Sequence, residues 1–474
     1  MCKLNWDKLL CEERIRQGDD NKNEFVTRDE FVTRNEFEAD YDRIVGSSSV
    51  RRLQDKAQVF PLQKNDFVRT RLTHSMEVSA VARSLGKTIG LFLEKEDGFK
   101  RDKTEKLMGM LQTAGLIHDL GNPPFGHYGE TAIRNWYIER ILQKSTEEIK
   151  KEGLEQEEAD FYYFDGNVQN LRIVTKLQTM NDEYGANFTY GTLAAIIKYP
   201  YSSTNFERKD KKFGYFKSEE DIIKRIREKT GLEEGIRHPA TYLLEAADDI
   251  VYIGDDIEDG VKKGYIPWKE EYAKLKETFG VQDRYKKLFE GIDSKKADSA
   301  LGDEEGLLAH VRMFRNCVQG HFIKTAIQCF KENYNSIMEG TFGLKDLLEA
   351  DAELIKNLKG ITGKFCFACE EVVTLEVVGE RVIKELLDIF YKAVKELNDE
   401  DIEKKKTYAG KIYHLISDNY KYIALFDYKE HVSKAFKDIN EYERLHLIID
   451  FVSGMTDSYA VSLYKKLLGI SLPE

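Results

Sequence analysis

Proline is scarce in this chain, at 7 of 474 residues. Because proline interrupts helices, this scarcity favours a mostly helical protein, as does the abundance of Leu, Ile, Glu and Lys. Long apolar runs are also missing, which argues against a membrane-spanning helix and predicts no membrane partner. The first residues lack the basic and apolar segments of a secretory signal, so none is predicted.

Cysteine and net positive charge are scarce as well. Six cysteines in a chain of this length indicate free thiols in a reducing compartment, so we expect a cytoplasmic protein. The formal net charge of −12 argues against a generally basic nucleic-acid-binding protein. The charge does not exclude a local basic patch. An acidic protein that bound a polyphosphate would need its Lys and Arg concentrated at the site, or a metal there. The hydrophobic content of 41% and charged content of 33% are typical of a globular protein.

The spacing of apolar residues predicts a series of helices joined by short polar links. Helical spacing begins at Leu72 and recurs in residues 106–120, 128–142, 167–177 and 191–198, and again after His238. No long stretch alternates as a strand would, although a few short strands would fit residues 201–235 and 355–380. The predicted fold is therefore mostly α.

The same pattern suggests three regions. We expect an N-terminal arm (1–40), a core with insertions (41–265) and a helical C-terminal region packed on that core (266–474). A six-residue word repeated in residues 23–40 has neither a helical nor a strand period, which indicates a duplication in a surface arm.

The run from Gly115 to Glu130 carries the densest set of side chains suited to catalysis. It contains His118, Asp119, His127 and Glu130 around a Gly-Asn-Pro-Pro turn. An adjacent His–Asp pair at the end of an apolar helix is costly to bury alone, and a divalent metal would be a favourable partner.

Two further side chains complete a candidate metal site with His118 and Asp119. His74 lies near the start of the first of these helices, and Asp248 lies on a later one. Two imidazoles and two carboxylates suit manganese, iron, cobalt, nickel, zinc or magnesium better than soft metals. Each histidine alone would more often be a core or surface residue, so the site depends on how the helices pack.

The helix after His238 presents a polar face. Asp248, Tyr252 and Asp256 are spaced at i, i+4 and i+8, which places them on one side of the helix. Such a face could line a site that holds a metal at one end and a sugar hydroxyl at the other. The alternative is a solvated acidic face, because further carboxylates follow in the same helix: Asp255, Glu258 and Asp259.

The order of His74, His118–Asp119 and Asp248 resembles the signature of the HD superfamily of metal-dependent phosphohydrolases. The flanking words narrow the resemblance. They are residues 51–62 (RRLQDKAQVFPL), 70–78 (TRLTHSMEV), 118–130 (HDLGNPPFGHYGE) and 245–250 (EAADDI), and all four closely resemble the deoxyguanosine triphosphate triphosphohydrolases. This resemblance covers residues 40–260 and implies an HD-domain helical core with an extended helical C-terminal region.

The resemblance implies hydrolysis of dGTP, or of another dNTP, to the deoxynucleoside and inorganic triphosphate. A divalent metal on His74, His118, Asp119 and Asp248 would polarise the α-phosphate and lower the pKa of a water. Mn²⁺ or Mg²⁺ is expected first, with Co²⁺, Fe²⁺, Ni²⁺ and Zn²⁺ also compatible with the ligands. In the family, the residues matching His127 and Glu130 are catalytic, with the carboxylate orienting the imidazole. The family also suggests a homo-oligomer, a hexamer.

Substrate-binding residues carry over from the same family. Gln54 and Asp256 match positions near the sugar 3′-hydroxyl, and Tyr252 matches an aromatic residue that packs on the sugar and crowds a ribose 2′-hydroxyl. The positions that match triphosphate contacts are Asn167, Lys198, Tyr199 and Lys212, with Arg71 and Arg312 as further candidates. Arg315 competes with Arg312 for its position.

Other functions stay open on the sequence alone. The same four ligands would serve an HD phosphohydrolase with relaxed dNTP choice or a nucleotide phosphodiesterase, although the words around Gln54 and the Pro-Pro turn argue against the latter. A nucleotide-sensing or DNA-binding protein on an HD scaffold is a different class, disfavoured by the intact ligands. A single-stranded DNA or nucleotide effector would be expected at the basic residues of 205–225.

Overall fold

The computed structural model describes residues 3–16, 34–60, 68–145, 147–149, 153–178, 182–205, 212–294, 302–404 and 406–470. Nearly all of its regular structure is helical, which confirms the predicted fold class. Among the described helices, none combines the length and apolar character needed to cross a bilayer.

The helices and strands follow one another along the chain in three groups. The first contains α1 (Trp6–Leu9), α2 (Glu36–Val45), α3 (Ser48–Arg52), η1 (Leu53–Asp55), α4 (Arg71–Glu96), α5 (Arg101–Ile117), α6 (His127–Tyr137), η2 (Ile138–Leu142), α8 (Gln156–Tyr162), α9 (Gly166–Arg172), η3 (Ile173–Leu177) and α10 (Tyr190–Ile196). The second contains η4 (Lys217–Glu219), α11 (Glu220–Thr230), α12 (Pro239–Lys262), α13 (Trp268–Phe279), α14 (Asp283–Asp293), α15 (Asp303–Glu332), α16 (Tyr334–Met338), η5 (Glu349–Asp351), α17 (Ala352–Thr362) and η6 (Gly363–Phe367). The third contains α18 (Glu370–Glu396), α19 (Asp399–Lys404), α20 (Tyr408–Leu415), α21 (Asp418–Ala424), β1 (Phe426–Asp427), β2 (Val432–Ser433), η7 (Phe436–Asp438), α22 (Glu441–Ser453) and α23 (Asp457–Leu467).

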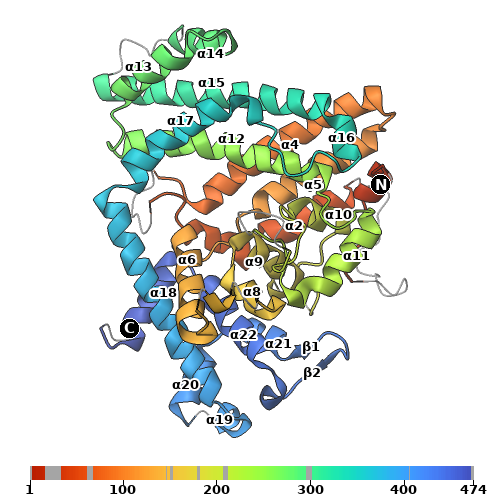
Figure 1. Ribbon diagram of the computed structural model, residues 1–474, viewed down its shortest axis with the longest axis vertical. Coiled ribbons are helices and arrows are strands. Elements are labelled where there is room, and N and C mark those ends of the chain that lie inside the picture. The colour runs from red at the N-terminus through yellow and green to blue at the C-terminus, as the bar shows by residue number, and fades with distance from the viewer. Residues whose placement is uncertain are drawn as a thin grey trace.

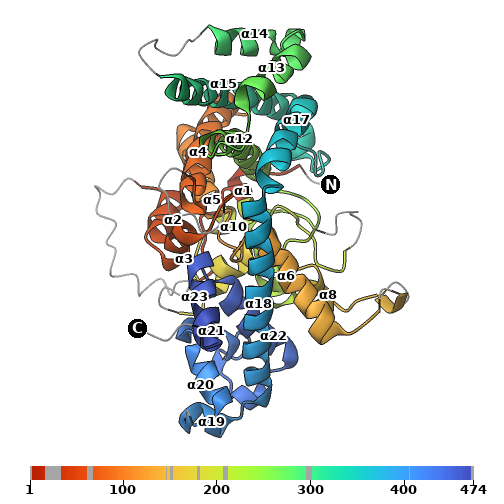
Figure 2. The same cartoon turned by 90° about the vertical axis from the view of Figure 1, so that its left-hand side faces the viewer.

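The molecule is longer than it is wide. Helices α13, α14 and α15 lie at one end, and α19, α20 and the β1–β2 hairpin lie at the other (Figure 1). The long helix α18 runs between the two ends, as the rotated view shows most clearly (Figure 2). The helices that carry the candidate site residues lie between these ends.

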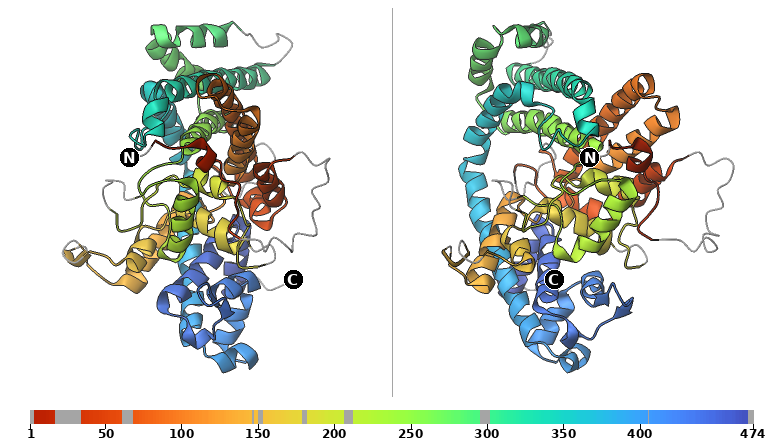
Figure 3. Two further views of the ribbon diagram at one scale, coloured as in Figure 1. Left: turned by 90° about the vertical axis from the view of Figure 1, so that its right-hand side faces the viewer. Right: turned by 45° about the vertical axis from the view of Figure 1, so that its right-hand side comes forward.

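Helices α4, α5 and α12 pack together (Figure 3). Of the predicted metal ligands, His74 lies on α4, Asp248 lies on α12, and His118 and Asp119 follow the last residue of α5. Helix α4 begins at a capping box in which the hydroxyl of Thr70 accepts a hydrogen bond from the amide of Thr73. Helix α5 returns beside α4, and Gly115 permits a close approach, because a Cβ there would lie 2.7 Å from the Cα of Ser79. This approach brings the end of α5 next to the start of α4.

Helix α12 begins with an imidazole cap. His238 Nδ1 accepts a hydrogen bond from the amide of Ala240 at 3.0 Å, which assigns the ring proton to Nε2, and Nε2 donates to the carbonyl of Leu9 at 3.1 Å. Burial lowers the pKa of His238 to about 4, so this imidazole is neutral. Pro239 follows at the first helical position, where no hydrogen-bond donor is needed. The cap therefore fixes the start of the helix that carries Asp248.

The strands lie where the sequence did not predict them. Over the described residues, the strands form one antiparallel pair, β1 with β2, in the C-terminal region. Residues 355–380 contain parts of α17 and α18 with η6 between them, so the expectation of strands there was wrong, and the described parts of 201–235 contain η4 and α11 and no strand. Apolar residues in α11 recur at helical spacing, with Ile222, Ile223 and Ile226 buried on one face.

The two boundaries proposed between regions, at residues 40 and 265, can be compared with the positions of the helices. Helix α2 crosses the boundary proposed at residue 40, and Trp6, Leu9 and Ile15 are buried in the hydrophobic core. The boundary at residue 265 falls between α12 and α13. Most of the repeat in 23–40 lies outside the described residues.

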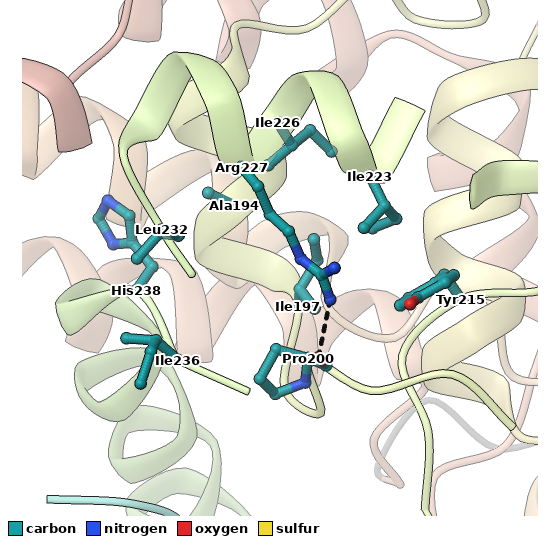
Figure 4. A pocket seen from close by; sticks show the side chains of 10 residues that line it. All are labelled: Ala194, Ile197, Pro200, Tyr215, Ile223, Ile226, Arg227, Leu232, Ile236 and His238. Atoms are coloured by element: carbon teal, nitrogen blue, oxygen red, sulfur yellow. Dashed lines mark hydrogen bonds between the residues drawn. The ribbon is translucent and has the colours of Figure 1, made fainter. Parts of the chain in front are cut away.

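A small apolar cavity lies between α10 and α11, with His238 at its edge (Figure 4). The Arg227 guanidinium closes one side by donating to the carbonyl of Pro200 at 3.1 Å. The cavity volume of about 20 Å³ holds about one water molecule, which excludes a nucleotide.

Candidate active site

The metal group consists of His74, His118 and Asp248, which come from α4, from the end of α5 and from α12. Asp248 Oδ1 lies 3.1 Å from His74 Nε2 and 3.4 Å from His118 Nε2. One donor atom from each residue falls within 4.8 Å of the others. Helix packing therefore brings together three of the four predicted ligands.

The orientation of His118 suits a metal ligand. Its Nδ1 lies 2.8 Å from the carbonyl of Gly115, one turn earlier, and donates to it. In the neutral ring this bond leaves the lone pair on the buried Nε2, which faces Asp248. A backbone carbonyl that fixes the tautomer is a common support for a metal-binding histidine.

The electrostatics of the group also favour a bound cation. Burial opposes the charged form of His118, but Asp119 and Asp248 outweigh it and raise the pKa to about 9. Burial likewise opposes the charged form of Asp248, yet His118 and His74 hold its pKa well below the usual range. Two imidazole nitrogens and one carboxylate oxygen fit a divalent metal, which would compete with the proton for this place.

Asp119 lies beside the metal group. Its Oδ1 is 3.7 Å from His118 Nε2. Arg71, predicted to contact the triphosphate, is buried and donates to Asp119 Oδ2 at 2.5 Å, and the Asn122 side chain donates to Oδ1 at 2.5 Å. These donors orient the carboxylate, and its place as a fourth ligand stays a prediction.

The Pro-Pro turn (residues 121–126) joins Asp119 to α6. Phe125 and Gly126 have φ of 62° and 60°, so the chain reverses sharply just before the helix begins at His127. His127 Nδ1 lies 3.1 Å from Glu130 Oε2, one turn further along α6. The predicted contact between these two side chains is present.

The two side chains of this pair differ in exposure. The imidazole of His127 is 83% exposed, whereas the carboxyl of Glu130 is buried and accepts from the amide of Gly166 at 2.8 Å. The hydrogen bond to Glu130, helped by the charge of that carboxylate, raises the pKa of His127 above its usual value. A fixed carboxylate thus holds an accessible imidazole.

Lys198 and Lys212, both predicted to contact phosphate, already have carboxylate partners. Lys198 Nζ lies 3.0 Å from Glu245 Oε1, and Lys212 is paired with Asp165. The Asp165 carboxylate also accepts from the Asn167 side chain at 2.7 Å. A bound polyphosphate would therefore have to draw these donors away from carboxylates.

Both lysines lie within electrostatic reach of the chemical groups. Burial opposes the charge on Lys198, but Glu245, Tyr199 and Asp248 raise its pKa. Burial also opposes the charge on Lys212, and the pKa is raised mainly by Asp165, with a contribution from Glu130. The cations of Lys198 and Arg237 each lie 5.8 Å from the ring of Tyr199. Lys198 therefore lies near Asp248 of the metal group, and Lys212 lies near Glu130.

The acidic face of α12 is buried, so the solvated alternative is wrong. Tyr252 is half-buried and its hydroxyl interacts with the carboxyl of the buried Asp256. Burial raises the pKa of Asp256 well above its usual value. Arg69 forms ion pairs with three neighbouring carboxylates, those of Asp255, Glu258 and Asp259.

The remaining candidates lie outside these contacts. Gln54 is exposed on η1. Arg312 is half exposed, with Nε 3.6 Å from Glu258, and Arg315 makes the shorter ion pair to the same carboxylate at 2.7 Å. Within the described residues, neither Gln54 nor Arg312 forms a hydrogen bond or ion pair with the metal group.

Several supporting residues escaped the sequence analysis. Asn122 donates to Asp119, and the amide of Gly166 donates to Glu130. Asp165 and Glu245 pair with the predicted phosphate-binding residues Lys212 and Lys198. Asp165 had a readable signal, because Asp before Gly-Asn is a typical helix cap and its side chain does cap α9. The others carry no local signal.

An HD-type arrangement, with ligands from three helices and a His–Glu pair just after the turn, defines a class of enzyme. Residues 71–172 match the HD domain family, and residues 403–466 match the phosphohydrolase-associated domain. The chain is therefore an HD-domain phosphohydrolase.

Curated relatives narrow this class. The chain is 40% identical over 485 residues to a deoxyguanosinetriphosphate triphosphohydrolase-like protein of Listeria monocytogenes, covering 99% of this chain and 100% of the relative. It is 30% identical over 518 residues to the deoxyguanosinetriphosphate triphosphohydrolase of an Enterobacter species, covering 99% and 98%. The Serratia proteamaculans enzyme of that name is 32% identical over 486 residues, covering 91% and 93%. The chain belongs to the deoxyguanosinetriphosphate triphosphohydrolase family.

Proposed function

We propose that the enzyme hydrolyses dGTP to deoxyguanosine and inorganic triphosphate. The observation that carries this proposal is the meeting of His74, His118 and Asp248 within 4.8 Å, next to the His127–Glu130 pair. The full-length similarity to relatives named for this reaction supports the choice of substrate.

We propose that a divalent cation, Mn²⁺ or Mg²⁺ first, binds His74, His118, Asp119 and Asp248. When bound, it would supply Lewis-acid polarisation of the α-phosphate and a lower pKa for the attacking water. In this arrangement Arg71 and Asn122 keep the Asp119 carboxylate oriented from the other side.

His127 and Glu130 would handle the proton. Water oxygen bonds to the α-phosphorus while the bond from that phosphorus to the sugar 5′ oxygen breaks, and the departing oxygen must gain a proton. Glu130 holds Nδ1 of His127, which leaves Nε2 to exchange a proton with the reacting atoms. The raised pKa of His127 keeps its protonated form available nearer neutral pH.

The substrate would be held by side chains on both sides of this pair. We propose that Asn167, Lys198, Tyr199 and Lys212 bind the triphosphate, with Arg71 and Arg312 as further contacts, and that Gln54, Tyr252 and Asp256 contact the sugar. The carboxyl of Asp256 is buried beside the hydroxyl of Tyr252, and this pair on one face of α12 is the strongest local support for a sugar contact. Lys198 and Lys212 would exchange carboxylate partners for phosphate oxygens.

Chromatographic product analysis tests the reaction. Purified enzyme with dGTP and Mn²⁺ should release deoxyguanosine and triphosphate in equal amounts, and the same assay with the other dNTPs and GTP defines the substrate range. Release of pyrophosphate with dGMP, or of single phosphate with dGDP, would refute the proposal. A homo-oligomer, a cytoplasmic location and a DNA or nucleotide effector stay predictions, and part of the 205–225 segment lies outside the described residues.

A further inference from the structure

Asp457, at the start of α23, joins two segments that are far from it in sequence. Its Oδ1 accepts a hydrogen bond from the amide of Phe125 at 2.9 Å, and its Oδ2 accepts one from the amide of Ala57 at 3.0 Å. The side chain is 2% exposed, so both bonds are shielded from water. One carboxylate thus connects the Pro-Pro turn with the segment that follows Gln54.

Lys56, next to Ala57 in the chain, donates hydrogen bonds to backbone carbonyls, whereas Asp457 accepts them from backbone amides. Its ammonium donates to the carbonyl of Asn122 at 2.5 Å and to the carbonyl of Ser453, at the end of α22, at 3.3 Å. Burial lowers the pKa of Lys56 to about 7, although Asp457 acts in the other direction. Lys56 therefore binds a carbonyl of the Pro-Pro turn and Asp457 binds an amide of the same turn, and the two residues are named here the polar clamp.

The turn needs such support. Phe125 has φ of 62°, a left-handed conformation that is unfavourable for a residue with a side chain. Conformations of this kind persist where the surroundings fix them. The ring of Phe125 also packs against α18, where a Cβ at Gly379 would lie 2.6 Å from its Cγ. The C-terminal helices therefore hold both the amide and the ring of Phe125.

We propose that Asp457 is a positioning residue for His127 and Glu130, with Lys56 as its partner. His127 follows Phe125 by two residues, so a change in the backbone at Phe125 moves the start of α6. The side chains of Lys56 and Asp457 form no hydrogen bond with His74, His118 or Asp248 in the described structure, although the backbone carbonyl of Lys56 accepts one from the amide of Arg71, the first residue of α4. Asp457 lies within the part that matches the phosphohydrolase-associated domain, so this contact gives that part a role in the reaction. For its effect on catalysis the inference rests on the proposed function.

The test compares Asp457→Asn with Thr456→Ala in the full-length enzyme. Asparagine keeps the size of the side chain but can no longer accept at both positions. Thr456 caps α23 through the amide of Tyr459 and does not touch the turn, so its variant weakens the same helix start without releasing Phe125. Asp457→Glu, which keeps the carboxylate and moves it by one methylene, is the conservative variant.

Asp457→Asn should lower kcat by about 10- to 100-fold with KM and bound Mn²⁺ little changed, because small misplacements of reacting groups are costly. Asp457→Glu should lie between this variant and the wild type, and Thr456→Ala should stay within about twofold of the wild type. Hydrogen exchange should speed up in peptides containing Phe125 and Ala57 in Asp457→Asn and stay unchanged in α12.

Two results would overturn the inference: a kcat for Asp457→Asn close to wild type, or an equal loss in Thr456→Ala. The hydrogen-exchange result does not depend on the substrate, so it separates a failure of this inference from a failure of the proposed function. If Asp457→Asn does not fold, the same comparison is made with Asp457→Glu.

Discussion

His74, His118 and Asp248 lie on three helices packed into the apolar core, whereas His127 and Glu130 follow a strained turn bound from the C-terminal region. The first set is fixed by close helix packing, as at Gly115. The second depends on individual polar bonds, from Gly166 to Glu130 and from the polar clamp to the turn. The difference teaches that metal binding and proton transfer should respond separately to mutation.

The largest effect should come from removing a metal ligand. Asp248→Ala deletes the oxygen that both histidines approach, so bound metal should be lost and kcat/KM should fall by more than about 1,000-fold. Metal analysis alongside a turnover assay checks this. Asp249→Ala is the matched control, because Asp249 is the next residue of α12 and pairs with Lys359 instead. If Asp248→Ala kept its metal, the ligand assignment would fail.

Removing the imidazole of His127 should abolish proton transfer without loss of metal binding. His127→Ala should lower kcat by about 100- to 10,000-fold while metal content stays at the wild-type level. His431→Ala, an exposed histidine on the hairpin side of the molecule, serves as the control. Near-normal turnover in His127→Ala would show that the pair does not handle the proton.

Gly121 tests how tightly the Pro-Pro turn before His127 packs against its neighbours. A Cβ at Gly121 would collide with the backbone of Gly166 and Asn170, and backbone cannot move aside as a flexible side chain can. Gly121→Ala should therefore destabilise the fold by about 1–3 kcal/mol, seen as a lower Tm. Gly46→Ala, where the added Cβ meets open space, should show no such loss, and equal Tm values for both variants would contradict the tight turn.

The smallest effect is a shift in the titration of His127. Its pKa is raised by Glu130, so the protonated form persists above the ordinary value of about 6.5 and is lost as pH rises through the raised value. Glu130→Gln should move this midpoint to lower pH. Diethyl pyrocarbonate reacts only with neutral imidazole, so its modification of the exposed His127, followed by mass spectrometry across pH, reports the midpoint directly. An unchanged midpoint would mean that Glu130 does not set the pKa.

The sequence predicted the groups whose spacing is local. His127 and Glu130 are three residues apart on a helix, and Asp248, Tyr252 and Asp256 repeat every four, so helical geometry alone groups them. The mostly α fold followed from composition and apolar spacing in the same way.

Contacts between distant segments could not be predicted. Arg71 binds Asp119, a partner that the sequence did not indicate, while its contact with the triphosphate stays a prediction. The acidic residues of α12 could have faced solvent, but three of them pair with Arg69. Asp457 carries no local signal in the sequence, because its partner Phe125 lies 332 positions away. Burial and pairing of this kind appear only when the helices pack.

Hydrolysis of dGTP in ¹⁸O-labelled water, with mass analysis of both products, tests the central claim most directly. Attack on the α-phosphorus predicts the label in inorganic triphosphate and none in deoxyguanosine. Label in deoxyguanosine, or label carried by pyrophosphate or single phosphate, would contradict the account.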